Sequence, residues 1–202
     1  MVGALMMGAG MAVAAEAEDA ETGRIEVARL TLAAEEKPVC FSPDFLTTVA
    51  RETELPVSRR LATVPLSSER IYQHPFVILS GSGELKLSEA ERANLKRYLD
   101  RGGFVYASAS CSNAQWANDF ERLMKRLQPE ETFEPVEKDD PLRHTLYDIE
   151  RIDTRRPAET TALHRLKVNG HADLVFSPVG INDTANAGAG WCCCGGNEVS
   201  NA

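Results

Sequence analysis

The chain has 202 residues, 43% of them hydrophobic and 26% charged, with a formal net charge of −8. This composition can build the core of one globular domain. The negative charge repels phosphate backbones, which excludes the basic surface of a typical nucleic-acid binder, so we expect no nucleic-acid partner.

Residues 1–23 predict an export signal and a short leader. An uncharged apolar run extends from Val2 to Ala15, and small residues near its end suit cleavage by signal peptidase. The run is shorter than the roughly 20 residues that span a bilayer, so we expect no membrane span in the mature chain. No basic residue precedes the run, which leaves an Ala-rich leader without a targeting role as the alternative. The export interpretation places the protein in the periplasm or cell envelope.

Residues 24–80 predict three strands and one helix. Ile25–Leu32 alternates apolar and mostly polar residues, which is the pattern of a half-buried strand. Ser42-Pro43 predicts a helix start with Ser42 as the N-cap, and Leu61–Val64 is a short strand candidate. Phe76–Ser80 is almost continuously apolar, which indicates a strand covered on both faces, as in a parallel sheet.

Residues 88–107 carry the clearest local pattern, a helix followed by a strand. Ser88 and Glu91 form a capping box, in which each side chain bonds the other residue's backbone N–H and marks a helix start. Gly102-Gly103 suits the helix end, because glycine readily adopts the left-handed cap conformation. Phe104–Ala107 then predicts a strand parallel to the preceding one.

The C-terminal half predicts a further helix, a loop and a hairpin. Trp116–Leu127 has the apolar spacing of an amphipathic helix, and residues 130–140, acidic and interrupted by prolines, predict a surface loop. Asn169-Gly170 is a strong hairpin signal between two apolar segments. We also place His74 in a turn and His164 at the surface.

The last residues, 197–202, resemble a capped helix start that is cut off after one turn. We therefore expect the domain over residues 24–202 to lack its last helix. Together the elements predict a doubly wound α/β domain with a mostly parallel sheet of flavodoxin-like topology and a C-terminal β-hairpin.

The ends of two neighbouring strands form the candidate site. Parallel α/β sheets bind ligands beyond the carboxyl ends of their strands, and free backbone N–H groups of a glycine-rich loop can hold a polar or anionic group there. Trp191, in a Gly-rich segment, could close over such a pocket. The predicted ligand-binding residues are Ser80, Gly81, Ser82, Gly83 and Trp191.

A second interpretation of the same strand ends is catalytic. The arrangement resembles class I glutamine amidotransferases, in which a glycine-rich loop after one strand helps to form the oxyanion hole. In that family the next strand ends in a turn with the nucleophilic cysteine, and Cys111 matches this position. A nearby helix N-terminus would lower the thiol pKa, and His144 or His171 would serve as the base. Ala109 and Asn113 stand where such turns usually carry glycine.

Several segments carry a resemblance to a known family: Pro75–Gly83, Asn94–Phe104, Asp140–Asp148, Phe176–Pro178 and, later, Gly190-Trp191. In the same order along the chain, they resemble a bacterial family catalogued as domain of unknown function 4159. The resemblance implies an amidotransferase-like α/β fold and a final helix after Asn197, but no reaction, because none is established for that family. Fold alone does not determine function.

The chain has five cysteines, so at least one thiol is unpaired within the molecule. The adjacent Cys192, Cys193 and Cys194 are too close in sequence to suit a tetrahedral zinc site, and we expect no metal. The sequence contains no dinucleotide fingerprint and no phosphate-binding glycine-lysine loop, so we expect no cofactor.

Three functions stay open from the sequence. The leading one is a non-catalytic module of the cell envelope that binds a small ligand or an envelope protein. The second is a cysteine-dependent amide hydrolase or amidotransferase-like enzyme. The third is a structural partner domain of an envelope assembly.

Overall fold

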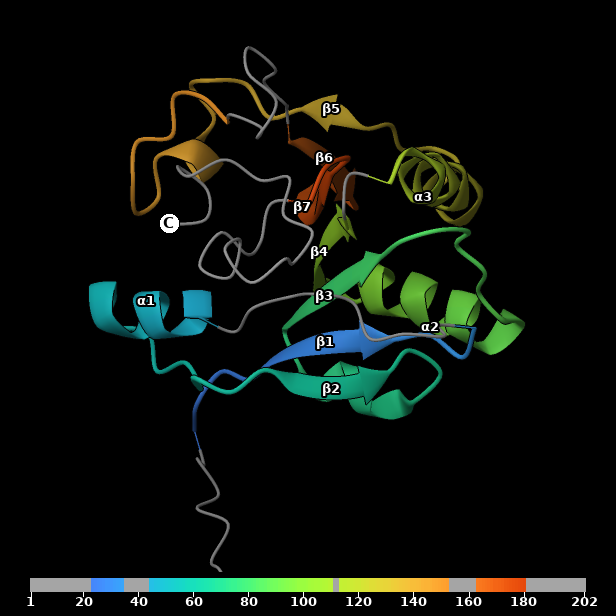
Figure 1. Ribbon diagram of the computed structural model, residues 1–202, viewed down its shortest axis with the longest axis horizontal. Coiled ribbons are helices and arrows are strands. Elements are labelled where there is room, and N and C mark those ends of the chain that lie inside the picture. The colour runs from blue at the N-terminus through green and yellow to red at the C-terminus, as the bar shows by residue number, and fades with distance from the viewer. Residues whose placement is uncertain (1–22, 35–43, 111–112, 153–162, 181–202) are drawn as a thin grey trace, which may run out of the picture.

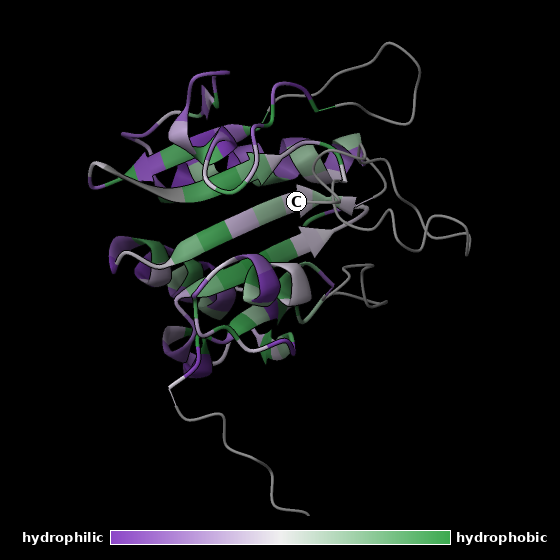
Figure 2. Ribbon diagram, turned by 90° about the vertical axis from the view of Figure 1, so that its left-hand side faces the viewer, coloured by the Kyte–Doolittle hydropathy of each residue, from purple (hydrophilic) through white to green (hydrophobic). Residues whose placement is uncertain are grey.

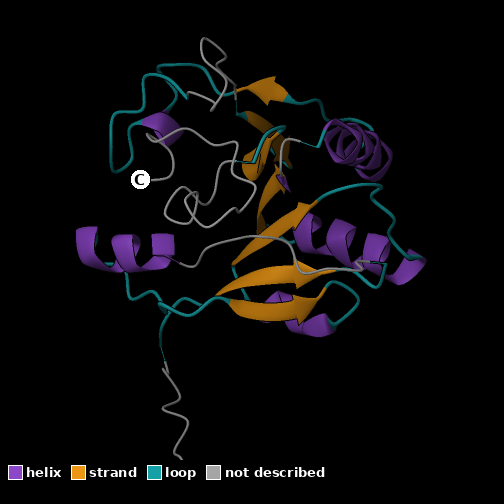
Figure 3. Ribbon diagram, viewed as in Figure 1, coloured by secondary structure: helices purple, strands orange, loops and turns teal. Residues whose placement is uncertain are grey.

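The computed structural model describes residues 23–34, 44–110, 113–152 and 163–180. Their strands form one seven-stranded sheet in the order β2-β1-β3-β4-β7-β6-β5, with helices packed around it (Figures 1 and 3). The strands are β1 (Val27–Thr31), β2 (Ala62–Pro65), β3 (Phe76–Gly81), β4 (Phe104–Ala109), β5 (Glu134–Pro135), β6 (His164–Val168) and β7 (His171–Ser177). The helices are α1 (Asp44–Glu52), α2 (Glu89–Asp100) and α3 (Ala114–Leu127), with short 3-10 helices η1 (Glu69–Gln73) and η3 (Pro141–Arg143).

Most of the sheet is parallel, as the apolar strand patterns predict. β1 pairs in parallel with β2 and β3, β3 with β4, and β4 with β7. β6 is antiparallel to both β7 and β5. The mixed α/β class and the mostly parallel sheet are therefore confirmed.

The two faces of the sheet are covered by different helices. One face packs on α2, α3 and η1, through a large apolar cluster that includes Leu95, Phe120 and Ile71. The opposite face packs on α1, through a smaller cluster around Leu46 and Ile78. Figure 2 shows hydrophobic residues along the strands and hydrophilic residues on the outer surfaces of the helices. Alternation along each strand thus assigns every residue to the α1 face or to the α2–α3 face.

Local side-chain chemistry sets the helix boundaries. At the start of α2 the Ser88 hydroxyl accepts from the Glu91 N–H while the Glu91 carboxylate accepts from the Ser88 N–H, so the predicted capping box is confirmed. Beyond the end of α2, Gly102 has φ +82, a left-handed conformation that favours glycine. Asn113 caps α3 by accepting from the Trp116 N–H at 2.9 Å.

The turn dipeptide Asn169-Gly170 joins β6 and β7, which pair antiparallel. Both turn residues have positive φ, +54 and +83 respectively, as a tight two-residue hairpin turn requires.

Two details of the sequence prediction are wrong, and a third residue is more buried than its pattern indicates. Residues 130–140 are not all surface loop, because they contain the two-residue edge strand β5 and the buried side chain of Asp140. His164 lies half-buried in β6, its ring centroid 6.3 Å from that of Phe176. His74 lies in a turn as predicted, at the end of η1, and only 3% of its surface is exposed. In each case packing from a distant strand or helix covers a polar residue, and no local pattern reveals it.

Other predictions fall outside the described residues. They are the export segment, the Ser42 cap and the helix start after Asn197. In the part of the chain that the structure describes, no helix has the length and apolar character needed to cross a bilayer.

Candidate functional site

The carboxyl ends of β3 and β4 lie at the same edge of the sheet. The two strands are parallel, with Ser80 opposite Ser108 and Gly81 opposite Ala109. Both strands end at this edge, and parallel α/β folds bind ligands beyond the carboxyl ends of their strands. The predicted meeting of the two strand ends is confirmed.

A direct contact joins these two strand ends. The hydroxyls of Ser80 and Ser110 lie 2.7 Å apart and form a buried hydrogen bond. Ser110 immediately precedes Cys111 in the sequence. Cys111 itself lies outside the described residues, so its role as a nucleophile stays a prediction.

Gly81 and Gly83, at the start of the loop after β3, are glycines for two different structural reasons. A Cβ added to Gly81 would lie 2.1 Å from Nε1 of Trp116, so the close packing of this indole requires glycine. Gly83 has φ +78 and open space around it, so it is suited to a turn. Ser82, between them, is exposed. The loop therefore combines a rigid start on α3 with an accessible tip.

A line of three serines crosses the sheet at this edge. Ser80 of β3 lies opposite Ser108 of β4, which lies opposite Ser177 of β7. We call these three residues the serine row. Alternation along β3 puts the row on the same face as Ile78, the α1 face. All three residues are buried.

The serine row is linked to Tyr106 and to the segment after β7. The hydroxyls of Ser177 and Ser108 both donate to the carbonyl oxygen of Val179, at 2.6 and 3.3 Å. Burial raises the pKa of the Tyr106 phenol, and its hydrogen bonds with Ser108 and Ser177 partly oppose that shift. Tyr106 is therefore neutral near pH 7, and the site is built from uncharged hydroxyls.

Two carboxylates tie the neighbouring loops in place. Glu91 accepts from the Ala33 N–H at 2.7 Å, which anchors the segment after β1 to the start of α2. Asp119 of α3 accepts from the Leu85 N–H at 3.1 Å, which anchors the loop after β3. Sequence reasoning recognised Glu91 only as a helix cap and missed Asp119, because both ties join residues far apart in the sequence.

His144 lies in the exposed loop after η3, with both ring nitrogens occupied. Nδ1 lies 2.8 Å from the Asp148 carboxylate, and Nε2 lies 2.7 Å from the Lys138 carbonyl oxygen. Both partners are acceptors, so both nitrogens donate. The Asp148 carboxylate is the main cause of a raised His144 pKa. In this state the ring has no lone pair to accept a proton, so action as a base requires one bond to break.

His171 does not lie near the strand ends of the candidate site. It begins β7, and Ser177 at the other end of β7 lies opposite Ser108. The backbone of His171 is therefore about 20 Å from this edge, at roughly 3.3 Å per residue. The interpretation of His171 as a base for Cys111 is wrong, because the hairpin turn places it at the amino edge of β4.

The remaining predicted ligand-binding residue is Trp191, which lies outside the described residues, as do the three adjacent cysteines, Cys192, Cys193 and Cys194. Across residues 23–34, 44–110, 113–152 and 163–180, no group of three or more His, Cys, Asp or Glu side chains could hold a metal ion.

Comparison with known proteins gives a family for the chain. A search of curated proteins found no match. A sequence model of the family described as "domain of unknown function (DUF4159)" matches residues 38–190. This range spans most of the chain and includes β3, β4, β7 and the serine row. The chain therefore belongs to the DUF4159 family.

Proposed function

We propose that the protein is an exported, non-catalytic module that binds a small polar ligand at the carboxyl edge of β3, β4 and β7. The observation that carries the proposal is the serine row together with the Ser80–Ser110 contact. A serine hydroxyl offers one donor and two acceptor positions. The hydrogen bonds described above leave part of this capacity for a ligand. The envelope location rests on the apolar residues at the start of the sequence.

The strand order supports a flavodoxin-like or class I glutamine amidotransferase-like fold, which is part of this proposal. The parallel strands follow the order β2-β1-β3-β4-β7, which corresponds to the flavodoxin-like order. In such sheets the strand order reverses between the first and third strands, and ligands bind there. The segments after β1 and β3, held by Glu91 and Asp119, flank this point.

Amide chemical-shift mapping of the full chain tests the binding proposal. Acetamide and glycerol serve as probes, because they offer the amide and hydroxyl groups that match the site. We expect saturable shifts at residues 31–34, 80–83 and 177–180. Absence of saturable shifts, or shifts confined to the amino edge of the sheet, would contradict the proposal and favour the structural partner domain.

A pair of serine variants makes this test specific. Ser108→Ala removes a hydroxyl of the serine row and should weaken probe binding about fivefold, equivalent to roughly 1 kcal/mol for one hydrogen bond. Ser58→Ala is the matched control, because Ser58 is also buried but follows the bridge between Ile25 and Val57, next to the start of β1. Equal weakening by both variants would indicate a general loss of structure.

A cysteine-dependent hydrolase or amidotransferase-like enzyme is the second candidate. The observation that favours it is the contact between Ser80, at the start of the glycine loop, and Ser110, which precedes Cys111 in the sequence. Iodoacetamide labelling at pH 6, followed by peptide mass analysis, tests it, with Cys111→Ser as the control. A lowered thiol pKa predicts that Cys111 is labelled much faster than an ordinary cysteine of pKa about 8.5. Labelling at the ordinary rate would contradict the enzyme hypothesis.

A further inference from the structure

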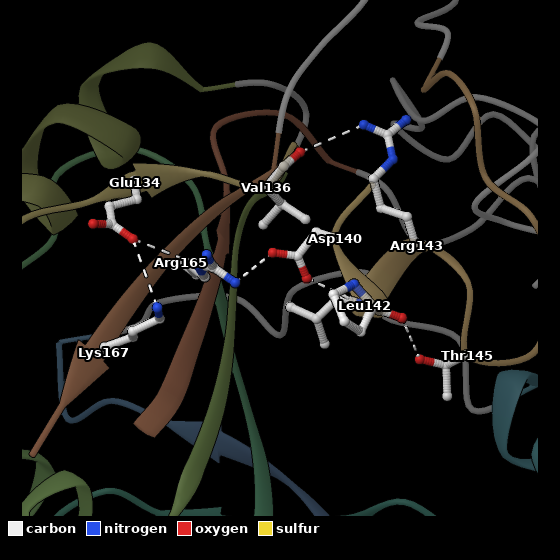
Figure 4. Close-up of polar contacts among 9 residues, drawn as sticks. Glu134, Val136, Asp140, Leu142, Arg143, Thr145, Arg165 and Lys167 are labelled. Atoms are coloured by element: carbon white, nitrogen blue, oxygen red, sulfur yellow. Dashed lines mark hydrogen bonds and ion pairs between the residues drawn. The ribbon is translucent and has the colours of Figure 1, made fainter. Parts of the chain in front are cut away.

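Arg143, in the loop between β5 and β6, has a charged side chain that is almost entirely buried. It ends η3, and 8% of its surface is exposed. Figure 4 shows its guanidinium extending away from Asp140, on the other side of η3 from Arg165. A buried cation is costly unless an anion or a full set of acceptors compensates for the lost water.

The hydrogen bonds of Arg143 do not provide that compensation. Nε donates to the Ile149 carbonyl at 2.7 Å, and Nη1 donates to the Val136 carbonyl at the longer distance of 3.5 Å. A guanidinium has five N–H donors, so three of them have no acceptor among the described residues. No nitrogen of Arg143 is among the fully buried, unpartnered atoms of that part of the chain, so these donors belong to the accessible side of the guanidinium. Within the same described ranges, no carboxylate forms an ion pair with Arg143.

The neighbouring arginine shows the contrasting arrangement. Arg165 of β6 pairs with Asp140, and its Nε lies 3.7 Å from the Glu134 carboxylate (Figure 4). That Nε is buried without a hydrogen-bond partner among the described residues, but both carboxylates neutralise the charge of Arg165. Asp140 is fully engaged, because its other oxygen accepts from the Leu142 N–H at 3.0 Å. Asp140 is therefore committed to Arg165 and the start of η3, and it does not neutralise Arg143.

The loop around Arg143 is cross-linked by its own hydrogen bonds. The Ile149 N–H donates to the Arg143 carbonyl at 2.8 Å, and the Thr145 hydroxyl donates to the Pro141 carbonyl at 2.9 Å. The two bonds of His144 add further ties to Lys138 and Asp148. These contacts hold the guanidinium in one place, so an anion would bind it without first ordering the loop.

We propose that Arg143 is a binding position for a carboxylate group of a small molecule or peptide from outside the chain. The planar guanidinium presents parallel N–H groups that match the two oxygens of a carboxylate. Its remaining donors supply the geometry, and the absence of an ion-pair partner among the described residues leaves its charge for a ligand. This site does not depend on the proposed binding at the serine row.

Titration with sodium acetate, followed by the Arg143 Nε–H resonance of the full chain, tests the proposal. We expect a saturable shift with a dissociation constant of about 10 mM or below. Sodium chloride at equal ionic strength should give no saturable shift. No saturation with acetate, an equal response to chloride, or saturation by inorganic phosphate alone would each overturn the carboxylate assignment.

Two lysine variants complete the experiment. Arg143→Lys keeps the charge but removes the planar guanidinium, so the affinity for acetate should fall about tenfold. The backbone amide shifts of residues 136–149 measure this affinity. Arg165→Lys is the matched control and should leave acetate affinity within about twofold, because Arg165 already has its carboxylates. If Arg143→Lys fails to fold, the wild-type resonance alone decides. Equal loss of affinity in both variants would overturn the assignment.

Discussion

The serine row and the loop around Arg143 differ in how far the hydrogen-bonding groups of their buried side chains are paired. At the serine row, neutral hydroxyls bond one another and the Val179 carbonyl. In the loop, the buried Arg143 guanidinium has two carbonyl partners among the residues that the structure describes. Hydrogen bonds to neighbouring groups offset the desolvation of a buried neutral hydroxyl, whereas a buried charge also needs an opposite charge. This difference is the reason why we propose a neutral polar ligand for the first region and a carboxylate for the second.

Removing the carboxylate of Asp140 should have the largest effect on stability. Asp140→Ala leaves Arg165 without its closest partner and removes the cap of η3. We expect a loss of about 3 kcal/mol in the free energy of unfolding, measured by urea denaturation. Asp139→Ala is the control, because Asp139 is exposed. A loss below about 1 kcal/mol would show that the loop tolerates a second uncompensated arginine.

Filling the space at Gly81 should have the next largest effect. Gly81→Ala forces its methyl group against the Trp116 indole, and we expect a loss of about 2 kcal/mol in the free energy of unfolding. Ser82→Ala, at an exposed position, should change stability by less than about 0.5 kcal/mol. Equal stability of Gly81→Ala and wild type would mean that Trp116 does not pack on this strand end.

Deleting one hydroxyl of the serine row should have a smaller effect. Ser177→Ala removes a donor to Val179 and a partner of Tyr106, and we expect a loss of about 1 kcal/mol. Thermal denaturation of this variant beside Ser67→Ala, an exposed control, measures the difference. An unchanged midpoint would indicate that water replaces the hydroxyl at no cost.

The smallest effect concerns the pH dependence of the loop. Bonds from both ring nitrogens of His144 raise its pKa above the ordinary 6.5. The contribution of the charged His144 ring to the free energy of unfolding is therefore complete below pH 6.5. It is lost as the pH rises through the pKa of His144 in the folded protein. NMR titration of the ring should give a pKa above 6.5, and Asp148→Asn should lower it. A wild-type value at or below 6.5 would contradict the doubly bonded ring.

Local patterns predicted the main helices and strands but not β5, the short 3-10 helices or the contacts between elements. The capping box of Ser88 and Glu91 determines where α2 begins, and Asn169-Gly170 determines the hairpin turn, because both depend on residues adjacent in sequence. The serine row depends on the register of three strands, which no single segment encodes.

The burial of Arg143 and the location of His171 have the same origin. Arg143 is covered because the chain returns at Ile149 and passes Val136. His171 lies at the amino edge because β7 runs parallel to β4. Long-range packing decides both, so the candidate site could be predicted only as two strand ends.

Disulfide formation between the two strand ends tests most directly the claim that they meet in one site. The account predicts that Ser80→Cys with Ser110→Cys, in a chain whose native cysteines are replaced by serine, forms a disulfide between the introduced thiols on oxidation, because the serine hydroxyls lie 2.7 Å apart. Ser80→Cys with Ser58→Cys is the control and should remain reduced. Thiols that stay free in the first pair, under conditions where the fold is intact, would contradict the account.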